Sequence, residues 1–320
     1  MPRPFERLPL HQLAERPADH PFFSTPERRV RVFTPALGET TASVRILGAG
    51  PPLLLIHGLM TTGYSWREVL APLAERYTLL VPDLIGAGRS LSPGCPLPPE
   101  AVADWLAALL EAMGVPNTVA IGNSMGGYLG LWLALRRPDL LRRLLIMHAP
   151  GLPEPRLRLL GWALRLPGAR GLLRALVQRD AERWVWRNVH YWDETKKSRE
   201  ELREYAAPLC TEAGLEGFLA QLRDMMSFAG TLRLQAALRA LPSGPAVPLR
   251  LLYARRDPMV PPAMGPRLQA LLPGTALDWA EEGGHFLHVD RPALFLRLAL
   301  PFLEAEPKGA APGAAPPPLG

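Results

Sequence analysis

The sequence predicts an α/β fold, in which a mostly parallel sheet is flanked by helices and carries an inserted helical cap. Two observations predict it. Short, continuously apolar runs, typical of strands buried on both faces, alternate with segments of helical spacing. This alternation is interrupted once, over residues 151–243, by segments rich in Leu, Arg and Trp that have helical character and no convincing buried strand.

The predicted core comprises residues 29–150 and 244–304, and its elements follow in order. A hairpin comes first, because the alternating run that begins at Arg29 turns near Gly38. Strands are then expected in PLLLIHG, YTLLVPDL, NTVAIGN, LRRLLIMHAP, PLRLLYARRD and ALDWAEEG. Helices are expected in WREVLAPLAE, over residues 101–113, 125–137 and 264–272, and from residue 292 onward. Pro138 stops the third of these helices.

The remaining segments of the chain have different characters. Residues 1–28 are rich in Pro and charge and are predicted to form an irregular arm. Residues 305–320 are of low complexity, which predicts a disordered tail. A length of 320 residues suits one α/β domain whose cap, residues 151–243, is an insertion.

Composition excludes several classes of protein. With 48% hydrophobic and 21% charged residues, the chain is typical of soluble globular proteins. The net charge of +6 favours acidic surfaces, but no Lys/Arg tract is interleaved with aromatics, so no nucleic-acid partner is predicted. Two cysteines, Cys95 and Cys210, argue against a disulfide scaffold, and no Cys/His cluster has metal-ligand spacing. Without a signal-peptide pattern or an apolar run of membrane length, a cytoplasmic location is expected.

Ser124 is the candidate nucleophile. It lies in the motif Gly122-Asn123-Ser124-Met125-Gly126, between a predicted buried strand and a predicted helix. A residue at such a sharp turn adopts a strained backbone, which requires small neighbours and lifts the hydroxyl clear of the sheet. The pentapeptide alone occurs by chance, and its placement between strand and helix makes the catalytic interpretation the favoured one over a glycine-rich helix start.

A serine hydroxyl needs a base, and the base needs an orienting acid. Asp257 follows one predicted strand in a proline-rich loop, and His285 follows the next strand after two glycines. The chain order is therefore Ser, Asp, His, with each residue at the carboxyl end of a strand, where open parallel sheets bind ligands.

With these motifs, the sequence resembles the α/β-hydrolases, from about Arg29 to Glu304, with the insertion as cap domain. The resemblance rests on HGL at 57–59, PDLIGAGRS at 82–90, GNSMGG at 122–127, and the segments around Asp257 and His285. It implies a capped, esterase-like serine hydrolase with a nucleophile elbow. Ser124 would attack a carbonyl carbon, His285 would transfer the proton, and Asp257 would hold the His285 tautomer.

The resemblance also implies an oxyanion hole. The backbone N–H groups of Met125 and Leu59 would stabilise the developing negative charge. Leu59 is inferred from its place after His57-Gly58, because the HGL segment lacks the multi-glycine form found in some lipases and esterases.

Other polar residues near these motifs are expected to be structural. His57 is interpreted as a hydrogen-bonded structural histidine, and Asp83 as a residue that shapes a tight loop. His288 is a rival base but lies in an apolar helix-start pattern, so His285 is preferred. Asp290 is predicted to cap the helix that follows, and Asp224 to lie on a solvated helical face.

The identity of the nucleophile, a serine and not a carboxylate, restricts the class of reaction. Haloalkane dehalogenases and epoxide hydrolases of this fold use a carboxylate in its place, and no cofactor motif is recognisable. A carboxylic ester hydrolase is therefore the leading prediction. The alternative is a carbon–carbon bond hydrolase of ring-fission products, although those relatives usually have Gly-Pro-Gly after His-Gly, which HGLMTTGYSW lacks. A non-catalytic ligand-binding protein of the same fold is the hypothesis from a different class.

The cap is expected to set substrate specificity. Its segment ERWVWRNVHYWDE is unusually aromatic and predicts an apolar pocket, or else contacts that fasten the cap to the core. A hydrophobic substrate of small to medium size follows, and the oligomeric state stays open. The candidate pocket residues are Met60, Trp66, Trp186, His190, Tyr191 and Met259.

A basic stretch of the cap, from Pro155 to Gln178, contains arginines and no acidic residue. One interpretation is an interfacial helix that meets lipid or an anionic substrate. The other is a core-facing Leu stripe with a solvated Arg face. We favour the second, so membrane contact is not the leading expectation.

Overall fold

The computed structural model describes residues 4–16, 19–164 and 166–305, and is built around an eight-stranded sheet. The strands are β1 (Glu27–Thr34), β2 (Gly38–Leu47), β3 (Pro52–Ile56), β4 (Thr78–Pro82), β5 (Thr118–Asn123), β6 (Leu141–Met147), β7 (Leu249–Ala254) and β8 (Ala276–Ala280). Their order is β1-β2-β4-β3-β5-β6-β7-β8. Strand β2 pairs in antiparallel orientation with β1 and β4, and the other described strand pairs are parallel, which confirms the predicted hairpin and the mostly parallel sheet. The predicted disordered tail, apart from residue 305, lies outside the described residues.

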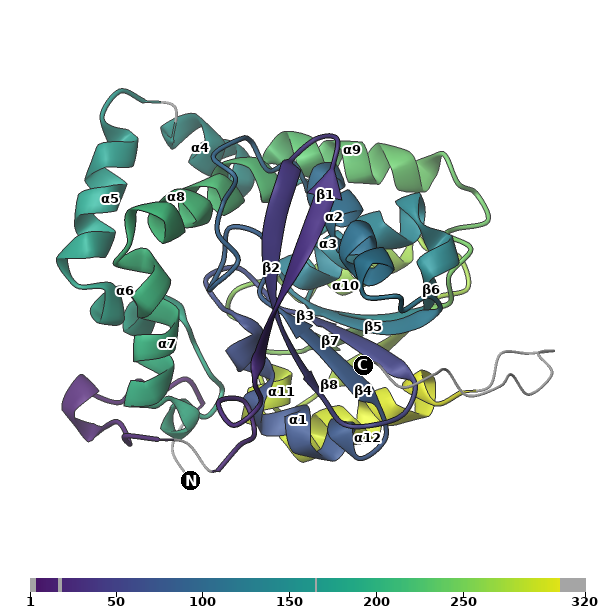
Figure 1. The fold of residues 1–320 in the computed structure, drawn as a ribbon, viewed down its shortest axis with the longest axis horizontal. Coiled ribbons are helices and arrows are strands. Elements are labelled where there is room, and N and C mark those ends of the chain that lie inside the picture. Colours follow the sequence, from purple (N-terminus) through teal and green to yellow (C-terminus); the bar gives the residue numbers. More distant parts are fainter. Residues whose placement is uncertain (1–3, 17–18, 165, 306–320) are drawn as a thin grey trace.

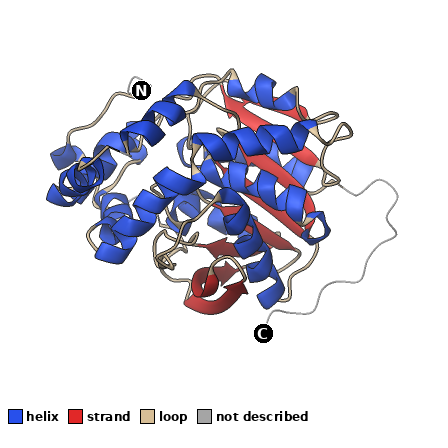
Figure 2. Cartoon of the chain, turned by 90° about the horizontal axis from the view of Figure 1, so that it is seen from above, coloured by secondary structure: helices blue, strands red, loops and turns tan. Residues whose placement is uncertain are grey.

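Helices cover both faces of the sheet (Figures 1 and 2). One face is covered by α2 (Pro99–Ala112), α3 (Met125–Arg136) and α10 (Met264–Gln269). The other is covered by α1 (Arg67–Ala74), α11 (Leu287–Asp290) and α12 (Pro292–Leu303). The apolar pattern around His288 indicates a helix start, but the sequence predicts a helix only from residue 292 onward, so the separate short helix α11 was not expected. Among the described residues, no helix combines the length and the apolar character needed to cross a bilayer.

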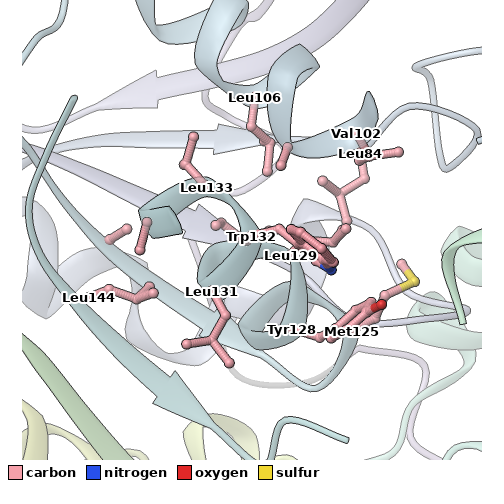
Figure 3. Close-up of a cluster of buried hydrophobic side chains, with 14 of the residues drawn as sticks. Leu84, Val102, Leu106, Met125, Tyr128, Leu129, Leu131, Trp132, Leu133 and Leu144 are labelled. Atoms are coloured by element: carbon pink, nitrogen blue, oxygen red, sulfur yellow. The ribbon is translucent and has the colours of Figure 1, made fainter. Parts of the chain in front are cut away.

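The apolar strand runs follow from this two-sided coverage. In β3, Leu53 and Leu55 belong to one buried cluster, whereas Leu54 and Ile56 belong to the cluster on the opposite face. Because successive side chains of a strand point to opposite faces, a strand covered on both sides must be continuously apolar. Figure 3 shows the cluster on the α3 side, with side chains of α2, α3 and β6 in mutual contact.

Six α-helices lie among the described residues between β6 and β7, in the segment where the sequence predicts the cap, and we call this inserted segment the cap. The helices are α4 (Pro155–Ala163), α5 (Ala169–Arg179), α6 (Ala181–Asn188), α7 (Arg199–Leu209), α8 (Glu212–Ala220) and α9 (Phe228–Arg239), with a π-helical turn at Gln221–Met225. In Figure 1, α5 to α8 lie to the left of the sheet and α9 lies above it, near α2. No strand occurs among the described residues of this insertion, as expected.

A buried ion pair fastens the cap to the core. Arg67 of α1 donates to Glu201 of α7 at 2.5 Å, and both side chains are 0% exposed. The N-terminal arm adds a second attachment, since Ala14 forms a β-bridge with Ser198 at the start of α7. The cap is thus held against the core by contacts that are remote from one another in sequence.

Candidate active site

Four neighbouring parallel strands bring the candidate catalytic residues to one edge of the sheet. Ser124 directly follows β5, and Asp257 and His285 follow β7 and β8 by a few residues. Strands β5, β6, β7 and β8 are adjacent and parallel, so their carboxyl ends share this edge. The edge is where the sequence analysis expects a ligand to bind.

The turn at Ser124 is strained, and its glycines make it possible. Ser124 has φ 56° and ψ −121°, a region that side-chain-bearing residues rarely adopt. A Cβ atom at Gly122 would overlap the carbonyl oxygen of Gly126, and one at Gly126 would overlap that of Ile56. Glycine is therefore required on both sides of the serine, which accounts for the G-x-S-x-G spacing.

Asp257 and His285 form a buried hydrogen-bonded pair. His285 Nδ1 lies 2.7 Å from Asp257 Oδ2, and the other oxygen, Oδ1, accepts the N–H groups of Met259 at 2.7 Å and Val260 at 2.9 Å. Burial by itself raises the pKa of Asp257, but the charge and hydrogen bond of His285 outweigh it and hold that pKa below its usual value. Asp257 is therefore ionised at neutral pH and hydrogen-bonded to His285.

Within the described residues, no hydrogen bond joins Ser124 Oγ to His285, and His285 Nε2 has no partner. Ser124 is half-buried, so its hydroxyl remains accessible. Catalytic hydrogen bonds are often long before substrate binds. The geometry leaves Nε2 free to accept a proton.

Two backbone N–H groups beside Ser124 lack acceptors in the described structure. Met125 begins α3, so its N–H has no acceptor within the helix, and Leu59 N–H makes no hydrogen bond. A Cβ atom on Gly58 would lie 3.2 Å from the Ser124 Cβ, which places the loop containing Leu59 against the serine. Free donors next to a nucleophile can stabilise an oxyanion.

His148, which was not predicted as a site residue, directly follows β6 on the same edge of the sheet. Its Nε2 accepts the Ala254 N–H at 3.0 Å, so Nδ1 carries the proton and faces Asn123 Oδ1 at 3.3 Å. Full burial lowers the pKa of His148 to about 3, so the ring is neutral at pH 7. His148 therefore links the ends of β5 and β7 on either side of it. Its place after a buried strand was the signal available in the sequence.

Three of the described residues at this edge, His148, Asp257 and His285, could together hold a metal ion. Ligand atoms of His148, Asp257 and His285 lie within 4.8 Å of one another. However, Nε2 of His148 accepts a backbone N–H, and Asp257 and His285 bond to each other. At Asp257, a metal would have to compete with the hydrogen bonds that occupy both carboxylate oxygens, so the cluster fits a hydrogen-bonded Asp–His pair better than a metal centre.

The residues interpreted as structural have structural partners. His57 Nε2 accepts the Leu84 N–H at 2.9 Å, and burial lowers the His57 pKa to about 4. Asp83 accepts the N–H groups of Gly63 and Arg89, at 2.9 and 2.8 Å, and so shapes its loop. Among the other candidates, His288 packs against Trp66, with ring centroids 4.3 Å apart, and makes no hydrogen bond to Asp257 in the described structure. Asp224 pairs with Arg223 and accepts the Leu97 N–H.

The structure corrects several predicted pocket residues. Trp66 and Tyr191 are 0% exposed, and they fill the interior instead of lining an open pocket. Trp186 is half-buried against the N-terminal arm, where its Nε1 donates to Leu8 O at 2.9 Å. These aromatics fasten the cap and the arm, which is the alternative that the sequence left open.

The other three pocket candidates are partly accessible. His190 has 29% side-chain exposure and lies 3.9 Å from Glu194, within the cap. Met60 is half-buried in the loop after β3, with φ 62°, next to Leu59. Met259 is half-buried and its N–H contacts Asp257, so it is the candidate closest to the acid–base pair.

Asp290 is not the predicted helix cap. The residue before α12 is Arg291, which makes no side-chain cap, whereas Asp290 accepts the Gly284 N–H at 2.9 Å and the Asp193 N–H at 3.2 Å. It therefore ties the loop that carries His285 to the cap. Burial raises the pKa of Asp290 to about 7, despite these hydrogen bonds.

This raised pKa predicts a pH-dependent stability. The unfolded carboxyl titrates near its ordinary value of about 4, so the protonated form favours folding and its contribution is full below about pH 4. It is lost as the pH rises through about 7. We expect the free energy of unfolding of the wild type, relative to Asp290→Asn, to fall by up to about 4 kcal/mol over this range. Urea denaturation at several pH values measures it, and a constant difference between the two proteins would contradict the expectation.

Residues 51–292 match the family described as alpha/beta hydrolase fold. An uncharacterized protein of Mycobacterium tuberculosis is 27% identical over 266 residues, covering 81% of this chain and 77% of that protein. The 2-hydroxy-6-oxo-2,4-heptadienoate hydrolase of Pseudomonas putida is 25% identical over 283 residues, covering 84% and 95%. The solved structure of an epoxide hydrolase (CorEH) has a TM-score of 0.74 at 21% identity, covering 87% of this chain and 99% of that one.

Proposed function

Because the chain belongs to the α/β-hydrolase family, we propose that it is a serine hydrolase that cleaves a carboxylic ester of a hydrophobic, small-to-medium substrate through an acyl-enzyme on Ser124. The observation that carries the proposal is one shared sheet edge. There, the strained serine after β5 lies with the Asp257–His285 pair, hydrogen-bonded at 2.7 Å. A serine at this turn supports an acyl intermediate over the alkyl ester that a carboxylate would form.

In the first half-reaction, Ser124 Oγ would attack the ester carbonyl carbon while His285 Nε2 accepts the hydroxyl proton. Asp257 would stabilise the imidazolium through the Nδ1 hydrogen bond. The N–H groups of Met125 and Leu59 would bind the oxyanion, and one such donor is typically worth about 10²–10³ in kcat. Collapse would break the bond to the alcohol oxygen, which takes the proton from His285.

In the second half-reaction, water would attack the acyl carbon with His285 as base, and would release the acid and restore Ser124. His148 supports both steps by staying neutral. Its ring centroid lies 5.5 Å from that of His285, and a second positive charge there would oppose formation of the imidazolium.

A second candidate function is hydrolysis of a carbon–carbon bond in a ring-fission product. The name of the Pseudomonas putida relative, which covers 84% of this chain, favours it. Against it, the loop after His57-Gly58 continues Leu59-Met60-Thr61 in place of the Gly-Pro-Gly expected in such hydrolases. The same triad would serve either reaction, so substrate tests must separate them.

Hydrolysis of p-nitrophenyl esters from acetate to palmitate tests the proposal. We expect turnover on the shorter esters, with a chain-length profile that measures the size of the acyl pocket. If no ester is turned over but a fluorophosphonate labels Ser124, the carbon–carbon hydrolase becomes the leading function. If there is neither turnover nor labelling, the protein is a non-catalytic member of the family.

A further inference from the structure

The outer helices of the cap expose large apolar side chains. Of the ten large hydrophobic residues that are exposed in the described parts of the chain, five lie between residues 159 and 176. They are Leu159 (64%), Trp162 (60%), Leu166 (44%), Leu172 (63%) and Leu176 (51%). Isolated exposed leucines are ordinary, but a concentration of this kind on two consecutive helices marks an interaction surface.

The spacing places these residues on unpartnered helix faces. Leu159 and Trp162 are three apart on α4, which buries none of its residues, and Leu172 and Leu176 are four apart on α5. Helix α5 buries only Val177. Figure 1 shows α5 at the left edge of the molecule, with α8 between it and the sheet. Leu173 and Val177 of α5 do pack against the core, as the expected core-facing stripe requires, but the five exposed residues named above lie outside that stripe.

The surface is cationic as well as apolar. Arg156, Arg158, Arg170 and Arg179 are exposed and have no ion pair in the described part of the chain. No acidic residue occurs between Pro155 and Arg179. A long arginine side chain can lay its apolar stem beside the leucines while its guanidinium reaches an anion.

A groove adjoins these leucines and gathers further arginines. It has a volume of about 140 Å³ and is lined by Leu164, Arg170, Gly171, Arg174, Glu216, Leu219 and Arg223. Arg174 pairs with Glu216 at 3.7 Å and with Glu212, and Arg223 pairs with Asp224. Arg170 has no carboxylate partner among the described residues, so it is free to bind a phosphate, which guanidinium groups bind in a bidentate manner.

We propose that α4 and α5 dock this protein onto an anionic phospholipid surface, with Trp162 and the exposed leucines entering the interface and the arginines binding headgroup phosphates. This goes beyond hydrolysis, because it places the cap at a membrane. Charge complementarity favours an anionic bilayer over a second copy of this chain as the partner of this surface. A second copy meeting this surface through a two-fold axis would bring the same unpaired arginines together, which repel each other. An anionic bilayer supplies both the apolar layer and the counter-charge.

Co-sedimentation with vesicles tests the proposal. We expect the wild type to bind phosphatidylcholine vesicles that contain phosphatidylglycerol at low salt, to bind pure phosphatidylcholine weakly, and to be released at high salt. Leu172→Glu/Leu176→Glu should weaken partitioning by about tenfold or more. Each Arg→Gln change at residues 156, 158 and 170 should weaken it about fivefold.

Matched controls come from exposed leucines elsewhere. Leu91 (58% exposed) and Leu232 (45% exposed) lie outside α4 and α5, so Leu91→Glu and Leu232→Glu should bind vesicles as the wild type does. All these sites are on the surface, and an unchanged Tm shows that a variant is folded. The proposal is overturned if the wild type does not bind anionic vesicles at low salt, or if the α5 variant binds them equally well. It is also overturned if sedimentation velocity shows a wild-type dimer that the α5 variant dissociates, because the surface would then hold a second copy.

Discussion

Replacing Ser124 with alanine is expected to lower kcat for ester hydrolysis by about 10⁴–10⁶-fold while leaving Tm nearly unchanged. The change removes only Oγ, which makes no hydrogen bond in the described structure. Alanine meets the same backbone strain at φ 56° as serine does, so the turn is kept. The residual rate would come from the oxyanion donors acting on direct attack by water. Steady-state kinetics on the best p-nitrophenyl ester and thermal unfolding of both proteins measure the two effects.

A serine remote from the site supplies the matched control. Ser24 lies in the N-terminal arm, is exposed, and donates to the Pro21 carbonyl at 3.1 Å. Ser24→Ala should keep full activity and full labelling by a fluorophosphonate, whereas Ser124→Ala should lose both. Substantial turnover by a folded Ser124→Ala protein would show that another group carries the chemistry.

Replacing Glu201 with alanine is expected to lower the free energy of unfolding by about 3–5 kcal/mol. Arg67 would remain buried at 0% side-chain exposure without the carboxylate that lies 2.5 Å away, and Glu68, at 3.7 Å from its Nε, would be its remaining carboxylate partner in the described structure. A buried charge that has lost both water and its closest partner is strongly destabilising. Urea denaturation measures the loss. Since the pair joins α1 to α7, we also expect weaker attachment of the cap.

Two further variants separate this effect from the loss of an ordinary ion pair. Glu304→Ala breaks the ion pair between Arg76, whose side chain is 52% exposed, and Glu304, whose side chain is 43% exposed. It should lower the free energy of unfolding by less than about 1 kcal/mol. Arg67→Met/Glu201→Leu removes both buried charges and should recover most of the stability lost in Glu201→Ala. Equal losses of unfolding free energy in Glu201→Ala and Glu304→Ala would mean that the buried ion pair stabilises the fold no more than an exposed one does.

The core of the fold could be predicted from the sequence because its signals are local. Strands covered on both faces must be apolar throughout, and every predicted core strand occurs within a residue or a few of its expected limits. Gly38 has φ 69°, which accounts for the hairpin turn at that position. The helix α11 was missed because four residues are too few to show a helical period.

The candidate site was only partly accessible to sequence reasoning. Ser124, Asp257 and His285 follow strands in chain order, and the structure brings Asp257 and His285 into contact at 2.7 Å. His148 was not predicted as a site residue because its hydrogen-bond partners, Asn123 and Ala254, come from the strands on either side of β6 and are distant in sequence. Asp290 was wrongly predicted to cap a helix because its position just before Pro292 fits the local pattern of a helix N-terminus. Its observed partner, Asp193, is 97 residues away in the chain and could not be identified from that pattern.

By itself, the sequence determined the order of strands and helices, the glycines that the turn at Ser124 requires, and the choice of serine over carboxylate at that turn. These depend on side chains within a few positions of one another and on backbone sterics. Only the tertiary structure decided which aromatics are buried, that Asp290 contacts Asp193 in the cap, and that Leu159, Leu172 and Leu176 of α4 and α5 face outward. Burial and pairing depend on which distant segments meet, because an apolar period shows that a helix has an apolar face but not what covers that face.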